Sequence, residues 1–256
     1  MKRYFIEVAY MGTAFHGSQL QGTTPTVQLY INQALSILLK ESVISFGASR
    51  TDEGVHALCA YYHFDTEKAL HPQFQYKLNA ILPETISVVQ VYECLGEHPI
   101  NARFDAIARG YRYIIYKKKN PFLQHRALYY PYSINRSILD ETAAVLKQFT
   151  DFETFSKKNT QTFTFQCTIF DAHWEEHTED ETLHFVVKAN RFLRGMVRGL
   201  VGTQLQIARK NKTVADFIKI IESKDCNQAD FSVAGHGLYL ENISYPDGKL
   251  QALTLR

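Results

Sequence analysis

Residues 2–10 have the sequence KRYFIEVAY, in which apolar side chains recur at every second position. In an extended chain Tyr4, Ile6, Val8 and Tyr10 point to one side, because successive side chains of a strand alternate between its two faces. The chain therefore opens with a predicted β-strand.

The order of elements that follows this strand occurs twice along the chain. A helix is predicted to start at Pro25-Thr26 and to end near Lys40, since apolar residues recur there at spacings of three and four. The rest of the first half is predicted as a strand and loop at 42–49, strands at 57–64 and 86–94, and a short helix at 74–82. In the second half, strands are predicted at 111–116, 168–175, 182–189 and 238–245, and helices at 137–149, 191–206 and 214–223. We therefore expect a mixed α/β (α+β) fold of two similar, closely packed domains, 1–103 and 104–256.

Composition excludes several classes of protein. With 256 residues, 45% of them hydrophobic and 21% charged, the chain is neither disordered nor a minimal scaffold. No apolar run approaches the roughly 20 residues of a membrane-spanning helix, and the first residues lack the pattern of a signal peptide, so we expect a cytoplasmic protein. The cysteines are scattered without a C-x-x-C pair, which predicts neither a zinc knuckle nor a disulfide framework. They are Cys59, Cys94, Cys167 and Cys226.

Charge is segregated along the chain, although the formal net charge is only +2. Residues 101–128 hold seven Lys or Arg and one acid, and residues 188–212 hold seven and none. Between these segments, residues 173–182 carry five acids. Each run alone fits a solvated surface. Two basic runs in a nearly neutral chain favour a localised site for an anionic partner, because polyanion binding depends on local potential.

Residues 49–57, with the sequence SRTDEGVHA, place charged and polar groups between two apolar strands. Gly54 permits a tight reversal that would project a carboxylate out of the sheet, and Arg50 would keep such a carboxylate charged. Asp52 is therefore a candidate nucleophile or base. The alternative is that Asp52 and Glu53 form an ordinary turn or cap.

Residues 173–177 match the H-x-x-E-H pattern of some zinc peptidases. That pattern binds zinc through two imidazoles on one face of a helix. Here the stretch is predicted as strand, turn and strand, which would separate His173 from His177 by about 13 Å. We interpret them as surface histidines near an acidic hairpin tip, and the zinc-peptidase reading is disfavoured.

Two further segments carry candidate binding residues. Tyr111 and Tyr113 lie on one face of a predicted strand and Arg112 on the other, so the tyrosines either stack on bases or belong to the core. Arg198 lies on a largely apolar helix. A buried guanidinium there requires a partner such as Asp52, and the alternative is that its head group reaches water.

Several motifs together resemble a known family, the TruA-type tRNA pseudouridine synthases. The segment from Arg50 to Ala57 is similar to the signature R-T-D-x-G-V-H-A, which is highly specific. The other matches are Tyr10-Met11-Gly12, Phe15-His16-Gly17, Gln19-Leu20-Gln21, Thr26-Val27-Gln28, residues 79–83 (NAILP), Ala102-Arg103-Phe104, R-x-Y-x-Y from Arg109, residues 190–198 (NRFLRGMVR), residues 237–240 (GLYL) and Tyr245-Pro246.

The chain departs from this family at three places. Ser18 stands where tryptophan is common, Ser49 where glycine is common, and Phe163-Thr164 where an Arg-Thr pair is common. We interpret these departures as affecting RNA contacts, including those of the loop 157–164, and as leaving the chemistry of Asp52 intact.

The resemblance implies two similar α/β domains whose antiparallel sheets join across a basic cleft. It also implies a homodimer that needs no cofactor and no metal and that isomerises uridines at positions 38 to 40 of the tRNA anticodon arm. Asp52 is expected to attack C1′, add to C6 or remove a sugar proton. Arg198 would be its charged partner, Tyr111 would stack on the uracil, and Arg50 would fill the space left by a flipped base. The expected RNA contacts are Arg103, Phe104, Lys117, Lys118 and Lys119. A catalytically silent RNA-binding module is the alternative from a different functional class.

Overall fold

A computed structural model describes residues 1–158, 163–210 and 212–254. The chain forms two compact units: unit 1 comprises Met1–Ile107 with Leu240–Arg256, and unit 2 comprises Ala108–Tyr239. This division differs from the predicted domains 1–103 and 104–256, because the C-terminal segment returns to unit 1. There, Leu250 pairs with Cys94. Such pairing between distant segments leaves no trace in local periodicity.

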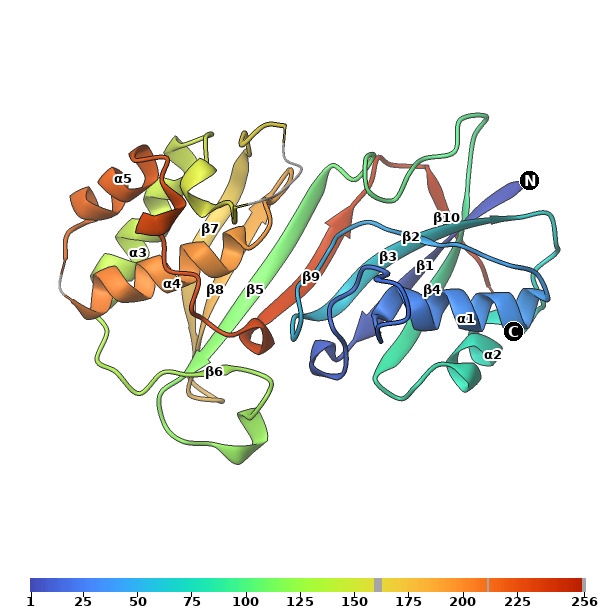
Figure 1. Cartoon of the computed structure of the whole chain (residues 1–256), viewed down its shortest axis with the longest axis horizontal. Helices are drawn as coiled ribbons and strands as arrows, with labels where there is room; N and C mark the ends of the chain where they lie inside the picture. Colours follow the sequence, from blue (N-terminus) through green and yellow to red (C-terminus); the bar gives the residue numbers. More distant parts are fainter. Residues whose placement is uncertain (159–162, 211, 255–256) are drawn as a thin grey trace. The chain divides into compact units, whose positions relative to one another are not determined.

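Unit 1 is built on an antiparallel sheet with helices on one face (Figure 1). Its strands, in the order in which they pair, are β10 (Leu250–Ala252), β4 (Ile86–Cys94), β1 (Lys2–Tyr10), β3 (His56–Thr66) and β9 (Leu238–Ser244), and β2 (Phe46–Gly47) pairs with β3. The strand predicted at 2–10 is confirmed, and its alternating side chains are buried as expected.

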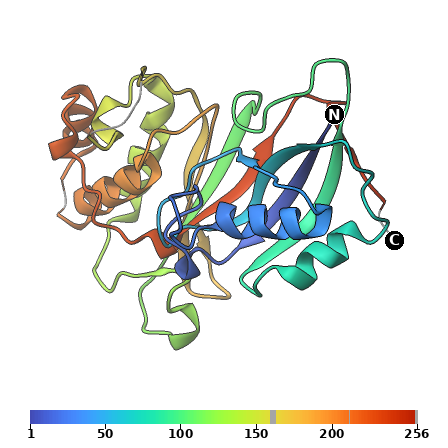
Figure 2. The same ribbon diagram turned by 45° about the vertical axis from the view of Figure 1, so that its right-hand side comes forward.

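Helices α1 (Val27–Leu39) and α2 (Phe74–Ile81) cover one face of this sheet (Figure 2). Tyr4 stacks on Phe64, which stacks on Phe74 of α2, so the alternating face of β1 is the face that the helices cover. The side-chain oxygen of Thr26 accepts a hydrogen bond from the Leu29 amide and caps α1. The helix ends at Lys40, whose backbone is left-handed with φ 53°. Both predicted ends of α1 are therefore confirmed.

Unit 2 contains a further set of mainly antiparallel strands. It consists of β5 (Ala108–Tyr116), β8 (Thr182–Ala189) and β7 (Ile169–His177), with the short β6 (Leu128–Tyr129) parallel to β5. Its helices are α3 (Arg136–Val145), α4 (Met196–Arg209) and α5 (Val214–Glu222).

Short 3-10 helices occur in both units of the described chain. They are η1 (Gly12–Ala14), η2 (Pro121–Leu123), η3 (Leu146–Gln148), η4 (Glu153–Phe155), η5 (Cys226–Gln228) and η6 (Gly235–Gly237). The expected mixed α/β class is confirmed.

Helix α4 begins later than the predicted range 191–206. Gly195 precedes it with φ 77°, a left-handed conformation from which the helix starts at Met196. The apolar stripe then runs to Arg209 and is almost entirely buried. In the described part of the chain, no helix has both the length and the apolar character required to cross a membrane.

His63 of β3 connects the sheet of unit 1 to the turn that follows residue 100. The residue is 2% exposed, and its Nδ1 accepts a hydrogen bond from the Ala102 amide at 3.1 Å. Burial, assisted by the charge of Arg3, lowers the pKa of His63 to about 4. The folded chain therefore holds this imidazole neutral, whereas the unfolded chain protonates it near pH 6.5.

This difference predicts a loss of stability in acid. Between pH 7.5 and pH 4.5 the unfolded state takes up the His63 proton and the folded state largely does not, which costs about 2 kcal/mol of unfolding free energy. The variant His63→Asn keeps an acceptor near the position of Nδ1 and should lose correspondingly less stability over this range in urea titrations. The exposed His98 supplies a control, His98→Asn, that should behave like the unmodified chain. Equal losses in the His63 variant and the unmodified chain would contradict the assignment.

Candidate active site

Asp52 lies in the connection between β2 and β3, at the turn predicted from its sequence. The Val55 amide donates to the Asp52 carbonyl at 3.2 Å, and Gly54 adopts φ 80°, which closes the turn. Asp52 is half-buried, whereas Arg50 and Glu53 are exposed. The turn interpretation and the functional one are thus compatible, because the turn presents a carboxylate from a defined position.

A second loop, residues 11–18, holds this turn from one side. The Ser18 amide donates to the Thr51 carbonyl at 3.1 Å, and the Thr51 amide donates to Ser18 Oγ at 2.8 Å. The hydroxyl groups of Tyr10 and Thr51 are hydrogen-bonded at 2.9 Å. Ser18 and Thr51 are both buried. The residue immediately before Asp52 is therefore fixed through its backbone and its side chain.

Two glycines allow the loops to approach this closely. A Cβ atom on Gly12 would lie 1.9 Å from the Val55 carbonyl oxygen, and the Gly12 amide donates to Nδ1 of His56 at 3.1 Å. Gly17 has φ 89°, and a Cβ there would lie 3.0 Å from the Thr51 oxygen. The Met11-Gly12 and His16-Gly17 steps of the sequence motifs thus have a steric role in supporting the turn.

The structure distinguishes the two adjacent carboxylates of the turn. The side chain of Glu53 is 72% exposed and lies 3.5 Å from the exposed His16 imidazole. Asp52 is the more enclosed of the two and directly follows the anchored Thr51. Of the pair, Asp52 is therefore the carboxylate that this loop architecture positions.

Among the departures from the resembled family, Ser18 has a structural role in addition to the predicted effect on RNA contacts, which stays a prediction. Its hydroxyl holds Thr51 next to Asp52, so Ser18 belongs to the support of the turn. The hydroxyl of Ser49 is buried without a hydrogen-bond partner in the described residues. Phe163 is fully exposed, and residues 159–162 of the divergent loop lie outside the described residues.

Tyr111 and Tyr113 lie on one face of β5 in unit 2, as predicted, and their environments differ. Tyr111 is 7% exposed and makes an edge-to-face contact with Phe192, with ring centroids 5.1 Å apart. Tyr113 is fully buried and donates to the Ala234 carbonyl at 2.7 Å. Burial raises the pKa of Tyr113, and the charge of Arg198 opposes that rise. Tyr113 is thus a core residue, which leaves Tyr111 as the candidate stacking residue.

Arg198 lies on the first turns of α4 and is half-buried. Its Nε donates to the Val233 carbonyl at 2.8 Å, and a terminal nitrogen donates to the Phe231 carbonyl at 3.3 Å. Both acceptors are backbone carbonyls, and together they orient the guanidinium. Arg198 belongs to unit 2 and Asp52 to unit 1, and their expected pairing stays a prediction.

Arg103 and Phe104 occupy an exposed turn of unit 1. The Asn101 side-chain oxygen accepts hydrogen bonds from both of their amides, at 2.9 and 3.3 Å. The Arg103 guanidinium lies 5.5 Å from the centre of the Phe104 ring, and Phe104 is 77% exposed. A cation and an open aromatic face thus stand together on a turn anchored to His63.

The predicted RNA contacts Lys117, Lys118 and Lys119 follow β5 and are exposed. Lys118, however, forms an ion pair with Glu181 of the acidic β7–β8 turn. Both side chains line a cavity of about 420 Å³. The acidic turn therefore neutralises part of this basic segment, which charge counts along the sequence did not indicate.

Comparisons with known proteins agree with these motifs. Residues 149–246 match a family model described as tRNA pseudouridine synthase. The chain is 41% identical over 248 residues to a tRNA pseudouridine synthase A of Azobacteroides pseudotrichonymphae, covering 96% of this chain and 98% of that protein. It is 42% identical to the protein of that name in Bacteroides thetaiotaomicron, covering 96% and 92%, and 35% identical to that of Bacillus subtilis, covering 93% and 97%.

The Ser18–Thr51 contact leads to a stability prediction. Replacing Ser18 with Ala leaves the buried Thr51 amide without its acceptor, and we expect a loss of about 1–3 kcal/mol in the free energy of unfolding. The exposed Ser42 offers a matched control, and Ser42→Ala should change stability by less than about 0.5 kcal/mol. Urea unfolding followed by circular dichroism measures both. Equal midpoints for Ser18→Ala and the unmodified chain would show that the contact does not hold the turn.

Proposed function

Because the chain belongs to the tRNA pseudouridine synthase A family, enzymes that isomerise uridine to pseudouridine in tRNA, we propose that it acts on uridines 38, 39 and 40 of the anticodon stem-loop, with Asp52 as the catalytic carboxylate. The observation that carries the residue assignment is the anchored turn. Thr51 is held on both its backbone and its side chain, and Asp52 follows it directly. A turn whose backbone is already fixed needs little further ordering when the substrate arrives.

The reaction is an isomerisation and its atoms balance without a co-reactant. The bond between C1′ and N1 breaks, the uracil turns, a bond forms between C1′ and C5, and the proton of C5 is released as N1 takes one up. An ionised carboxylate serves each of three routes: attack on C1′, addition to C6, or removal of a sugar proton. In all of them Asp52 is the group that contacts the reacting nucleoside.

Tyr111 is proposed to stack on the uracil while it is detached. Its ring is held by the edge-to-face contact with Phe192, which fixes the orientation of the ring. The phenolic oxygen is proposed to take part in removing the C5 proton. Arg198 is the proposed charged partner of Asp52, because its two carbonyl contacts orient the guanidinium.

Base flipping is part of the proposal, since a uridine paired in a stem is out of reach of a protein carboxylate. Extrusion costs a few kcal/mol of stacking and pairing. Arg50 is exposed two residues before Asp52, which suits it to fill the vacated space and to contact a phosphate. We extend the proposal to a homodimer acting in the cytoplasm. Sedimentation equilibrium tests this part, and a monomer at micromolar concentration would contradict it.

The catalytic assignment has a matched pair of variants in adjacent carboxylates. Asp52→Asn should abolish release of tritium from tRNA labelled at C5 of uridine and should leave tRNA affinity nearly unchanged. Glu53→Gln should retain most of the activity, because that side chain is solvated. Normal turnover by the Asp52 variant would refute the assignment. Absence of tritium release by the unmodified chain would refute the proposed reaction.

The basic segment after β5 yields a second prediction. Lys117→Ala and Lys119→Ala should each weaken tRNA binding and lower the slope of log affinity against log salt by about 1, if each lysine contacts one phosphate. Lys118→Ala should have a smaller effect, because Lys118 is already paired with Glu181. Filter binding at several salt concentrations measures these slopes. A larger effect for Lys118 than for its neighbours would contradict the interpretation.

A further inference from the structure

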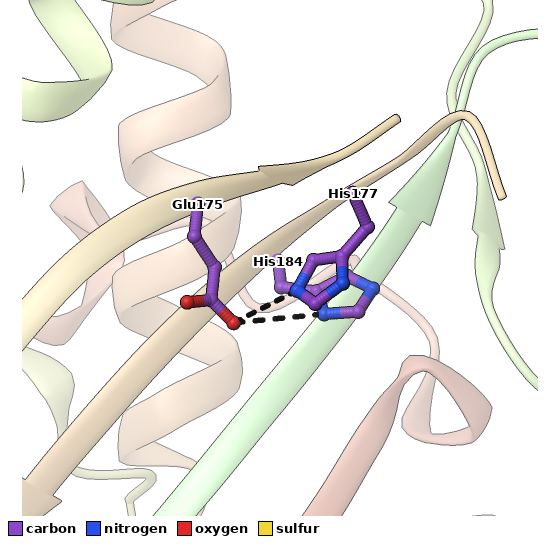
Figure 3. A group of neighbouring side chains, drawn as sticks. All are labelled: Glu175, His177 and His184. Atoms are coloured by element: carbon purple, nitrogen blue, oxygen red, sulfur yellow. Dashed lines mark hydrogen bonds and ion pairs between the residues drawn. The ribbon is translucent and has the colours of Figure 1, made fainter. Parts of the chain in front are cut away.

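The β7–β8 hairpin of unit 2 brings together three side chains that the proposed reaction does not use (Figure 3). Glu175 is the cross-strand partner of His184, and His177 lies two residues beyond Glu175 on the same face of β7. Glu175, His177 and His184 each offer one atom able to bind a metal ion, and these atoms all lie within 4.8 Å of one another. Tyr111 pairs with Val187, so it lies on the opposite face of this sheet.

His184 provides an independent indication of a ligand. The residue is 5% exposed, and its Nε2 is hydrogen-bonded to the Thr182 hydroxyl at 2.9 Å. Its Nδ1 is buried and has no hydrogen-bond partner among the described residues. When Nε2 donates to Thr182, Nδ1 carries a bare lone pair. That lone pair lies 3.9 Å from the Glu175 carboxylate, which cannot satisfy it, because both atoms are acceptors.

The other two side chains connect this buried nitrogen to solvent. Oε1 of Glu175 lies 2.9 Å from Nε2 of His177 and 3.9 Å from Nδ1 of His184. The side chains of Glu175 and His177 are 41% and 39% exposed. An ion can therefore reach His184 from solvent past Glu175 and His177. The side chains of these two residues also have space to change conformation.

We propose that Glu175, His177 and His184 bind a single divalent metal ion such as Zn²⁺ or Co²⁺. The ligands are two imidazole nitrogens and one carboxylate oxygen. Imidazole ligands favour such ions over Mg²⁺ and Ca²⁺, which prefer oxygen. Water completes the coordination in this arrangement. The hydrogen bond between Thr182 and His184 is the kind of outer contact that orients a metal-binding histidine.

Binding requires a small, defined rearrangement. Around a tetrahedral ion with ligands at about 2.1 Å, the ligand atoms stand about 3.4 Å apart. The contact between Glu175 and His177 must lengthen and the one between Glu175 and His184 must shorten. The rings of His177 and His184 are stacked with centroids 3.9 Å apart, and a ring nitrogen binds metal in the plane of its ring. His177, the more exposed of the two rings, must therefore rotate out of the stack.

The surrounding charges moderate the expected affinity. His173 lies 3.6 Å from Oε2 of Glu175 and 3.0 Å from Asp171, on the outer side of the three ligands. The positive charge of Arg112 acts on His184 and disfavours a cation bound at that imidazole. Only one of the three ligands is negatively charged, and a guanidinium lies nearby. We therefore expect this site to bind the ion with micromolar affinity, more weakly than closed structural zinc sites do.

The test is isothermal titration of the chelator-treated full chain with ZnCl₂ at pH 7.5 under reducing conditions. We expect binding of a single ion with an affinity near micromolar. His177→Asn should weaken it at least tenfold and, because His177 is only half-buried, should leave the fold intact by circular dichroism. Glu175→Gln should weaken it similarly. His173→Asn is the matched control on the same face of β7 and should keep most of the affinity.

Three results would overturn the proposal. They are no heat of binding up to millimolar Zn²⁺, unchanged affinity in His177→Asn, and equal loss of affinity in the His173 control. The readout is independent of tRNA, so it separates this site from the function proposed for Asp52. Titration with Co²⁺ adds a spectroscopic check, since ligation by the imidazoles should give visible absorption bands that disappear in His177→Asn.

Discussion

The reciprocal contact between Ser18 and Thr51 is the constraint on which the candidate active site depends. Two backbone amides and one hydroxyl are satisfied between two loops that precede and follow other elements of unit 1. Without that pairing, the amide of Thr51 would be buried and unsatisfied, at a cost of about 1–3 kcal/mol. The glycines at 12 and 17 are what make the distance achievable, because a side chain at either position meets backbone. Rigidity at Asp52 is thus a product of sterics and hydrogen bonding outside the Asp52 residue itself.

The local elements could be predicted from the sequence because each carries its own signal. The alternation in residues 2–10 and the cap at Thr26 depend on neighbours within a few positions, and both are present in the structure. The start of α4 was placed too early, since the apolar spacing begins before Gly195, whose left-handed backbone delays the helix. Apolar spacing alone extends the predicted helix through Gly195. The left-handed backbone of Gly195 does not allow the helix to begin before it.

The features that were missed all involve partners distant in sequence. The return of the C-terminal strands to unit 1 depends on pairs such as Leu250 with Cys94. The support of Asp52 by Ser18 spans more than thirty positions. The neutralisation of Lys118 by Glu181 required the hairpin turn to lie beside the end of β5. In each of these cases a sequence motif identifies the residue itself. The residue that it contacts is known only from the order and pairing of the strands.

The H-x-x-E-H segment shows how one pattern changes meaning with its backbone. On a helix, the two histidines of the motif would share one face and one ion. On β7, the motif instead lines up His173, Glu175 and His177 at alternate positions, and the cross-strand neighbour His184 completes a group around the central glutamate. The second imidazole therefore comes from the pairing register and not from the motif. The group of Glu175, His177 and His184 can be identified from the two-residue alternation of β7 combined with the pairing register of the hairpin. That register is known only once residues 178–181 are recognised as the turn.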